Sequence, residues 1–341
     1  MSQIASFRAK LAPLTKYLDD SSITEIAINR PGEVWLGKQG HRFMQSVSLP
    51  ELTNGLLDSL GDVIASYSAQ EASRQRPLLS ATIPINLGEN IPVTERGGFR
   101  VQVIKAPVVE EGTIAICIRK PTLLDLSLDD YSAKGAFTNV NYQSENDRNS
   151  GEKLTSLFNQ KAWPEFLKHA VRSHKNIVIS AGTNTGKTTL LNALLKEIAL
   201  EERVVTIEDS REIRPVQSNR LHLIYSRGGQ GEAQVTTVDL LEATLRLTPD
   251  RAIMGELRGA EAYSYLELLN SGHTGSITTI HADSPRLMFD RLAQMVMRFG
   301  STMNKEQIVD YAKSLIDVVI QLKRGPDGHR YISEIQYENH N

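Results

Sequence analysis

One stretch of the chain combines an apolar strand, a loop rich in glycine and threonine, and an apolar helix in direct succession. It reads NIVISAGTNTGKTTLLNALLKEI, with the predicted strand at residues 177–180 and the loop at residues 181–189. After the loop, apolar side chains recur at helical spacing, at Leu190, Leu191, Leu194, Leu195 and Ile198. This order of strand, loop and helix is the context that a phosphate-binding loop requires, and it predicts an α/β fold.

The residues of this loop suit a nucleoside triphosphate and its magnesium ion. Backbone N–H groups of such a loop point at phosphate oxygens, and the start of the next helix adds unpaired donors and a positive dipole end. Gly186 allows close approach of the backbone, Lys187 reaches the terminal phosphates, and Thr188 is suited to ligate Mg²⁺. We predict that ATP binds to Ala181, Gly182, Thr183, Asn184, Thr185, Gly186, Lys187, Thr188 and Thr189.

The loop departs from the usual pattern at one position, where Ala181 replaces the first glycine and Gly182 follows it. Small size is kept there, so the prediction stands. The alternative is a turn rich in Gly and Thr that ends in a solvated lysine. That alternative does not explain the apolar strand before the loop or the apolar helix after it.

Acidic residues follow two predicted strands further along the chain. Glu208 and Asp209 come directly after the strand at residues 204–207, and Glu256 comes after a strand that contains Met254. Because ligands gather at the carboxyl ends of parallel strands, we expect these acids beside the loop. We predict that Glu256 activates the attacking water and that Glu208 helps to hold the metal ion. Two alternatives stay open: Asp209 as a cap of the next turn, and Glu256 as a solvated loop acid.

A third segment, SGHTGSITTIHA, has a histidine on each side of a predicted strand, His273 before it and His281 at its end. His281 is suited to donate a hydrogen bond to a phosphate or to a neighbouring subunit, so it is a candidate catalytic residue. A purely structural role is equally open for His281, and it is the favoured interpretation for His273.

The chain divides into two folded parts and a connector. Residues 1–120 contain bunched short strands and helices, which predicts a smaller α+β domain with an antiparallel sheet and helices on one side. Residues 121–160 have weak periodicity and a polar tail, which predicts a long linker with one short helix near Asp129. In residues 161–341 strands and helices alternate, which predicts a mostly parallel sheet covered on both faces.

Composition limits the classes of function. With 38 Lys and Arg against 40 Asp and Glu, the net charge is −2, so direct DNA binding is not indicated. The single cysteine, Cys117, cannot form an internal disulfide, which fits a reducing compartment. No segment approaches the ~20 apolar residues of a membrane span. The mildly amphipathic FRAKLAPLTKYL is interrupted by Pro13, so we expect a short packed helix there, although it has the composition for peripheral membrane contact.

Taken together and in this order, these segments resemble the secretion ATPase superfamily, which powers type II and type IV secretion and pilus motors. The resemblance rests on AGTNTGKTT, TIEDSREI, RLTPDRAIMGELRG and GHTGSITTIHA, and it covers nearly all of residues 161–341. It implies a C-terminal RecA-like P-loop ATPase domain. The whole chain most resembles the traffic ATPase of type IV secretion and plasmid conjugation systems. That resemblance implies a cytoplasmic homo-hexamer, peripheral at the inner membrane, whose partners are other components of the machine.

The N-terminal segments GGFRVQVIKAP and GTIAICIRKP resemble the two strands that supply nucleotide-contacting arginines in this superfamily. The resemblance gives this role to Arg100 and Arg119, which would otherwise be interpreted as surface charge. The long linker resembles the branch in which the N-terminal domain packs over a neighbouring subunit's ATPase domain. An arginine supplied by another domain would couple domain closure to hydrolysis. We also expect a positive cleft from the basic residues Arg96, Arg100, Lys105, Arg119 and Lys120.

Two other interpretations stay open. One is a pilus retraction-type motor of the same superfamily, against which the long linker argues. The other is a ring scaffold switched by nucleotide binding, against which the presence of both Glu208 and Glu256 argues. A type II secretion ATPase usually carries a four-cysteine metal-binding insert, and a chain with one cysteine lacks it.

Overall fold

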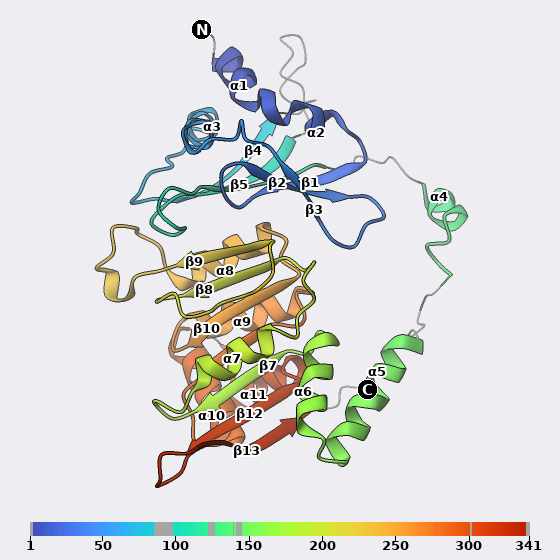
Figure 1. Cartoon of the computed structure of the whole chain (residues 1–341), viewed down its shortest axis with the longest axis vertical. Coiled ribbons are helices and arrows are strands. Elements are labelled where there is room, and N and C mark those ends of the chain that lie inside the picture. Colours follow the sequence, from blue (N-terminus) through green and yellow to red (C-terminus); the bar gives the residue numbers. More distant parts are fainter. Residues whose placement is uncertain are drawn as a thin grey trace.

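The computed structural model describes residues 3–84, 98–121, 127–138, 140, 145–300 and 302–338. These residues form two sheets, one above the other in Figure 1, and each sheet has its own helices. Arg96 and the end of the predicted strand SATIPINL lie outside the described residues. No helix in the described part of the chain is long and apolar enough to cross a bilayer.

The first sheet has six strands in the order β3-β2-β1-β6-β5-β4, and all neighbouring strands are antiparallel. Its strands are β1 (Ile23–Ile28), β2 (Glu33–Lys38), β3 (Gln45–Ser48), β4 (Leu78–Pro84), β5 (Gly98–Ile104) and β6 (Ala115–Arg119). Three helices cover one face (Figure 1): α1 (Gln3–Leu11), α2 (Thr15–Asp19) and α3 (Asn54–Tyr67). The predicted α+β domain with helices on one side is confirmed.

Helix α3 shows how the sequence sets this packing. The Thr53 side chain caps its first turn by accepting a hydrogen bond from the N–H of Leu56. Leu57, Leu60 and Ile64 recur at helical spacing and are fully buried against the sheet. The amphipathic pattern therefore fixes which face of the sheet the helix covers.

The second sheet has seven strands in the order β13-β12-β7-β11-β10-β8-β9, and every neighbouring pair is parallel except β12 with β13. Its strands are β7 (Ile177–Ala181), β8 (Val204–Glu208), β9 (Arg220–Ile224), β10 (Arg251–Leu257), β11 (Ile277–Ile280), β12 (Val318–Arg324) and β13 (Arg330–Tyr337). The mostly parallel sheet predicted for this half is confirmed, with one antiparallel strand at its edge.

Helices cover both faces of this sheet. On one face lie α5 (Glu145–Asn159), α6 (Trp163–Arg172) and α7 (Lys187–Leu195). On the other lie α8 (Thr237–Arg246), α9 (Glu261–Asn270), α10 (Pro285–Arg298) and α11 (Lys305–Leu315). Alternate residues of β7 point to opposite faces of the sheet. Ile177 and Ile179 pack with α6 and α7, whereas Val178 packs on the other side.

The connector contains more helix than its sequence indicates. The short helix expected near Asp129 is α4 (Leu128–Ala133), which starts at a capping box between Ser127 and Asp130 and stands to one side of both sheets in Figure 1. Residues 145–159, expected as linker, instead form α5. Leu154 of this helix is fully buried against α6, so the second half of the connector packs onto the core of the second sheet.

The bare face of the first sheet packs against the β9 edge of the second. Ala27, Trp35 and Cys117 share one apolar cluster with Leu221 and Leu223 of β9. A buried guanidinium joins the same contact: Arg203 Nη1 donates to Asn29 Oδ1 at 2.9 Å and to Asn219 Oδ1 at 2.6 Å. Burying an arginine without hydrogen bonds is costly. These bonds satisfy the buried guanidinium and so stabilise the contact between the two sheets.

Candidate active site

The predicted phosphate loop connects β7 to α7. Its conformation depends on Gly186, which immediately precedes α7 with a φ of 94°, in the left-handed region that favours glycine. Asn184 also has a positive φ, 59°, which asparagine tolerates better than most residues. The hydroxyl of Thr185 donates to the carbonyl of Gly182 at 2.9 Å and so closes the loop on itself. The loop therefore leads directly into the N-terminus of a helix, where anions bind well.

The side chain of Lys187 folds back over this loop. Its Nζ donates to the carbonyl of Gly182 at 3.3 Å and lies 3.1 Å from Nδ1 of His281. Burial lowers the pKa of Lys187, while the nearby carboxylate of Glu256 raises it. The ammonium group is thus at the loop, beside the residue that follows β11 and near the acid of β10.

Glu256 lies near the end of β10 and is largely buried. Its Oε2 accepts a hydrogen bond from Arg258 Nη2 at 2.6 Å, whereas Oε1 has no hydrogen-bond partner among the described residues. Burial raises the pKa of Glu256, and the charge of Lys187 partly opposes this rise. A buried carboxylate with one oxygen that accepts no hydrogen bond has the properties of a general base.

His281 joins the lysine and the acid. Its Nε2 lies 3.3 Å from Oε1 of Glu256, and its ring also contacts Lys187. Burial and the charge of Lys187 lower the pKa of His281, so the imidazole is neutral at neutral pH. His273 lies apart from this group, since its Nδ1 contacts the Ser271 hydroxyl at 3.0 Å. Burial lowers the pKa of His273, and the charge of Arg119 lowers it further.

Glu208 was expected to be a metal ligand, but its carboxylate is occupied by hydrogen bonds from the backbone. Its Oε2 accepts hydrogen bonds from the backbone N–H groups of Glu212 at 2.7 Å and Ile213 at 2.9 Å. These bonds fix the turn after β8. As a result, Oε2 of Glu212 accepts a hydrogen bond from the Thr188 hydroxyl at 3.1 Å. The carboxylate that contacts Thr188 is therefore Glu212, which the sequence analysis did not single out.

Asp209, the other acid after β8, forms ion pairs. Its Oδ2 lies 2.6 Å from Arg227 Nη2 and 3.9 Å from Arg258 Nη1. Arg258 is also the partner of Glu256. Asp209 thus lies near the arginine that pairs with Glu256, and its contacts are ion pairs rather than those of a simple cap of the following turn.

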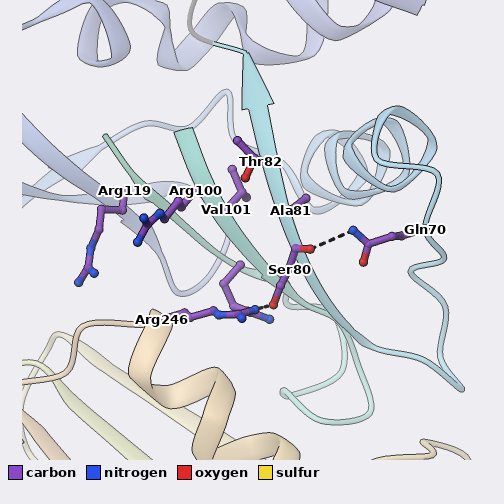
Figure 2. A pocket seen from close by; sticks show the side chains of 9 residues that line it. Gln70, Ser80, Ala81, Thr82, Arg100, Val101, Arg119 and Arg246 are labelled. Atoms are coloured by element: carbon purple, nitrogen blue, oxygen red, sulfur yellow. Dashed lines mark hydrogen bonds between the residues drawn. The ribbon is translucent and has the colours of Figure 1, made fainter. Parts of the chain in front are cut away.

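Arg100 and Arg119 lie in the first sheet, away from the phosphate loop of their own chain. They face each other directly in the register of β5 and β6. Both line a cavity of about 470 Å³ together with Arg246, from the last turn of α8, and Figure 2 shows the three side chains at this cavity. No phosphate-loop residue lines it among the residues that the structure describes.

The surroundings of these arginines leave their charges uncompensated within the described ranges, where none of the three forms an ion pair. Glu25 is the cross-strand neighbour of Arg119, but its carboxylate accepts hydrogen bonds from Cys117 and Thr248 instead. Like charges directly opposite each other destabilise a sheet. The cavity therefore has the charge of an anion-binding site.

Lys105 and Lys120, which were also expected in a positive cleft, make their contacts elsewhere. Lys105 pairs with Asp58 and Asp62 of α3, on the opposite face of the sheet. Lys120 donates to the carbonyl of Asp20 at 2.6 Å. Of the four predicted basic residues that the structure describes, Arg100 and Arg119 are therefore the two that line the cavity.

Comparison with known proteins decides the family. The model of the type II/IV secretion system protein family matches residues 141–327. The chain belongs to this family. It is 36% identical over 348 residues to the type IV secretion system protein VirB11 of Bartonella quintana, with 98% of this chain and 94% of that protein covered. It is 34% identical over 354 residues to PtlH of Bordetella pertussis, with 98% and 96% covered.

A solved structure agrees with this assignment to the secretion family. It is that of the VirB11 ATPase from the type IV secretion system of Brucella suis, in complex with sulphate. The two folds superpose with a TM-score of 0.86 at 37% identity, over 98% of this chain and 95% of that chain. The resemblance inferred from the four motifs is confirmed, as is the RecA-like fold, and family membership implies ATPase activity.

Proposed function

We propose that this protein hydrolyses ATP to power substrate transfer or pilus assembly in a type IV secretion machine. The observation that carries the proposal is the meeting of Lys187, His281 and Glu256, which come from three adjacent parallel strands in the order β7-β11-β10. Lysine supplies charge where charge develops on the terminal phosphate, and the acid accepts a proton from water. Type IV secretion system relatives of nearly equal length support the cellular role.

The residues around Thr188 fit a magnesium ion. Mg²⁺ prefers oxygen ligands and binds through one or two protein groups together with phosphates and water. The Thr188 hydroxyl and the Glu212 carboxylate provide such oxygens, 3.1 Å apart. When bound, the ion neutralises charge on the β- and γ-phosphates. We assign Glu208 the task of holding the turn that presents Glu212, in place of the direct metal contact expected from sequence.

We further propose that Arg100 and Arg119 act on a nucleotide held by a neighbouring subunit of a hexameric ring. Their cavity is separate from the phosphate loop of the same chain, and it is positively charged without a carboxylate partner among the described residues. Arg246, which sequence analysis did not single out, adds a third cation to it. A neighbour's γ-phosphate supplies the anion that this arrangement lacks.

We also propose that the ring lies at the cytoplasmic face of the inner membrane, attached peripherally, with other secretion components as its partners. Its support is the family and the printed names of the relatives as secretion system proteins. The ATPase part then comprises residues 161–341 together with α5, which packs onto the same core.

An ATPase assay with two variants tests the proposed chemistry. Lys187→Ala should fold and show no turnover, because the charge at the γ-phosphate is missing. Glu256→Gln should still bind ATP while turnover falls by roughly a hundredfold or more, the scale of a lost general base. Nucleotide binding by calorimetry separates the two effects. A Lys187→Ala variant that hydrolyses ATP near the wild-type rate would show that the site is assigned wrongly.

A further inference from the structure

A second cation touches the phosphate loop from the side opposite to the catalytic groups. Arg330, the first residue of β13, donates from Nη2 to Oδ1 of Asn184 at 3.0 Å. Its Cδ lies 3.4 Å from the point that a Cβ on Gly186 would occupy, and its Nη1 lies 3.7 Å from that point. The guanidinium therefore lies against the loop directly before α7 begins.

The order of the strands shows which part of a nucleotide lies near this arginine. Strands β11 and β10, which carry His281 and Glu256, are on one side of β7, whereas β12 and β13 are on the other. The terminal phosphate must face Glu256, because that is where the attacking water is activated. The rest of the nucleotide then leaves the loop toward the hairpin of β12 and β13, where Arg330 lies.

The electrostatics of this position also favour an anion. A cation near the N-terminus of a helix is opposed by the helix dipole. Arg330 faces a second arginine, Arg324, directly across the hairpin, and like charges so placed destabilise a strand pair. Within the described residues, the guanidinium of Arg330 forms no ion pair, and its only hydrogen bond is to the neutral side chain of Asn184. A phosphate group would relieve both repulsions.

We propose that Arg330 is a nucleotide-binding residue that contacts the α-phosphate end of the phosphate chain, with Asn184 holding its guanidinium in position. The inference rests on the proposed nucleotide site and adds to it a residue from the C-terminal hairpin. The α-phosphate changes little during hydrolysis. Arg330 therefore stabilises the bound substrate and the transition state to the same degree. Its loss should raise KM and leave kcat nearly unchanged.

The hairpin offers a matched control. Arg324 is the cross-strand partner of Arg330 and is exposed like it, but its guanidinium lies against Gly328 in the hairpin turn, with Nη2 3.3 Å from the position of an added Cβ. Arg324→Ala removes the same charge from the same hairpin without touching the loop. A comparison of the two variants therefore separates contact with the nucleotide from general loss of positive charge.

The experiment measures the Kd of ADP and of GDP by calorimetry for the wild type, Arg330→Ala and Arg324→Ala, with thermal unfolding as a check on folding. We expect Arg330→Ala to weaken both nucleotides to the same degree, by about tenfold or more, as for a lost charge-assisted hydrogen bond. Arg324→Ala should stay within about twofold, because its exposed guanidinium lies against the hairpin turn rather than the loop, and exposed surface charges contribute little.

Each other outcome overturns part of the account. Equal Kd values for Arg330→Ala and the wild type would show that Arg330 does not bind nucleotide, while the proposed function would stand. A loss seen with ADP alone would place the guanidinium on the base and contradict the phosphate contact. A wild-type protein that binds neither nucleotide would overturn the proposed function itself, and this inference with it.

Discussion

Glu256, the proposed general base, shows at the scale of a single residue how burial changes the properties of a carboxyl group. One of its oxygens is held by Arg258, and the other has no hydrogen-bond partner among the described residues. Lys187 and His281 lie close enough to interact electrostatically with this carboxylate. Because burial raises the pKa of this carboxyl, the group binds a proton more readily than an exposed glutamate and is a stronger base once ionised.

The raised pKa predicts where activity is lost in acid. Glu256 acts as a base only when ionised, so kcat should fall as the pH drops through its pKa, and this acid limb should lie above the ordinary value of 4.5. A pH–rate profile measures the limb. His281 also gains a proton in acid, below its ordinary 6.5. The profile of His281→Gln should keep the limb, and a limb that disappears in that variant would assign it to the histidine instead.

The sequence alone was enough to predict that three residues of this site lie together. Lys187 and His281 come after strands of one parallel sheet and Glu256 lies near the end of another, and the ends of such strands meet at one edge. The contact between Glu212 and Thr188 could not be predicted, because it depends on a turn that Glu208 fixes through two backbone hydrogen bonds. The contact of Arg330 with the phosphate loop could not be predicted either, because it depends on the pairing of β12 and β13.

At the scale of elements, a buried ion pair fixes the start of β10. The guanidinium of Arg251 is fully buried, and its Nε lies 2.5 Å from Oε2 of Glu202. It also donates to the carbonyl of Val171 at 2.9 Å and to that of Gly275 at 3.2 Å. One side chain thus ties together α6, β10 and the loop before β11, which leads to His281. We therefore expect the position of His281, a proposed catalytic residue, to depend on this support.

Two glycines of that loop allow a controlled test. Both have a positive φ, 92° at Gly272 and 80° at Gly275. An added Cβ at Gly272 meets nothing within 4 Å, whereas one at Gly275 would lie 2.0 Å from Nη1 of Arg251. Gly272→Ala should cost about 1–2 kcal/mol of backbone strain. Gly275→Ala should cost about 1–3 kcal/mol more through overpacking. Urea unfolding measures both, and equal losses would contradict the role of Arg251.

Helix α5 and strand β12 were not predicted from the sequence pattern, for physical reasons. The first turns of α5 are strongly polar, so the helical pattern appears only near Leu154, where the helix meets α6. The strand β12 continues an apolar run that begins in α11. Asp317 breaks that run, because its carboxylate accepts hydrogen bonds from Lys175 Nζ and from the backbone N–H of Asn176. Both elements are determined by tertiary contacts rather than by local pattern.

At the scale of the whole molecule, the two sheets of one chain form a closely bonded unit. Arg203 is buried between them with Asn29 and Asn219, and Val108 of the first part accepts a backbone hydrogen bond from Ile224 at 2.7 Å. This contact leaves Arg100 and Arg119 at a cavity that does not include their own phosphate loop. We therefore expect the catalytic movement to occur between neighbouring chains rather than between these two sheets.

We propose that each active site takes its phosphate loop from one subunit and its arginines from another. The direct test is to co-express Lys187→Ala subunits with Arg119→Ala subunits, confirm mixed rings by native mass spectrometry, and measure ATPase activity. Each variant alone should be inactive. If the arginine acts across subunits, about a quarter of the interfaces in a random ring combine an intact loop with an intact arginine, so activity should return to about that fraction. If mixed rings form and remain inactive, the two groups act within one chain and the account is wrong.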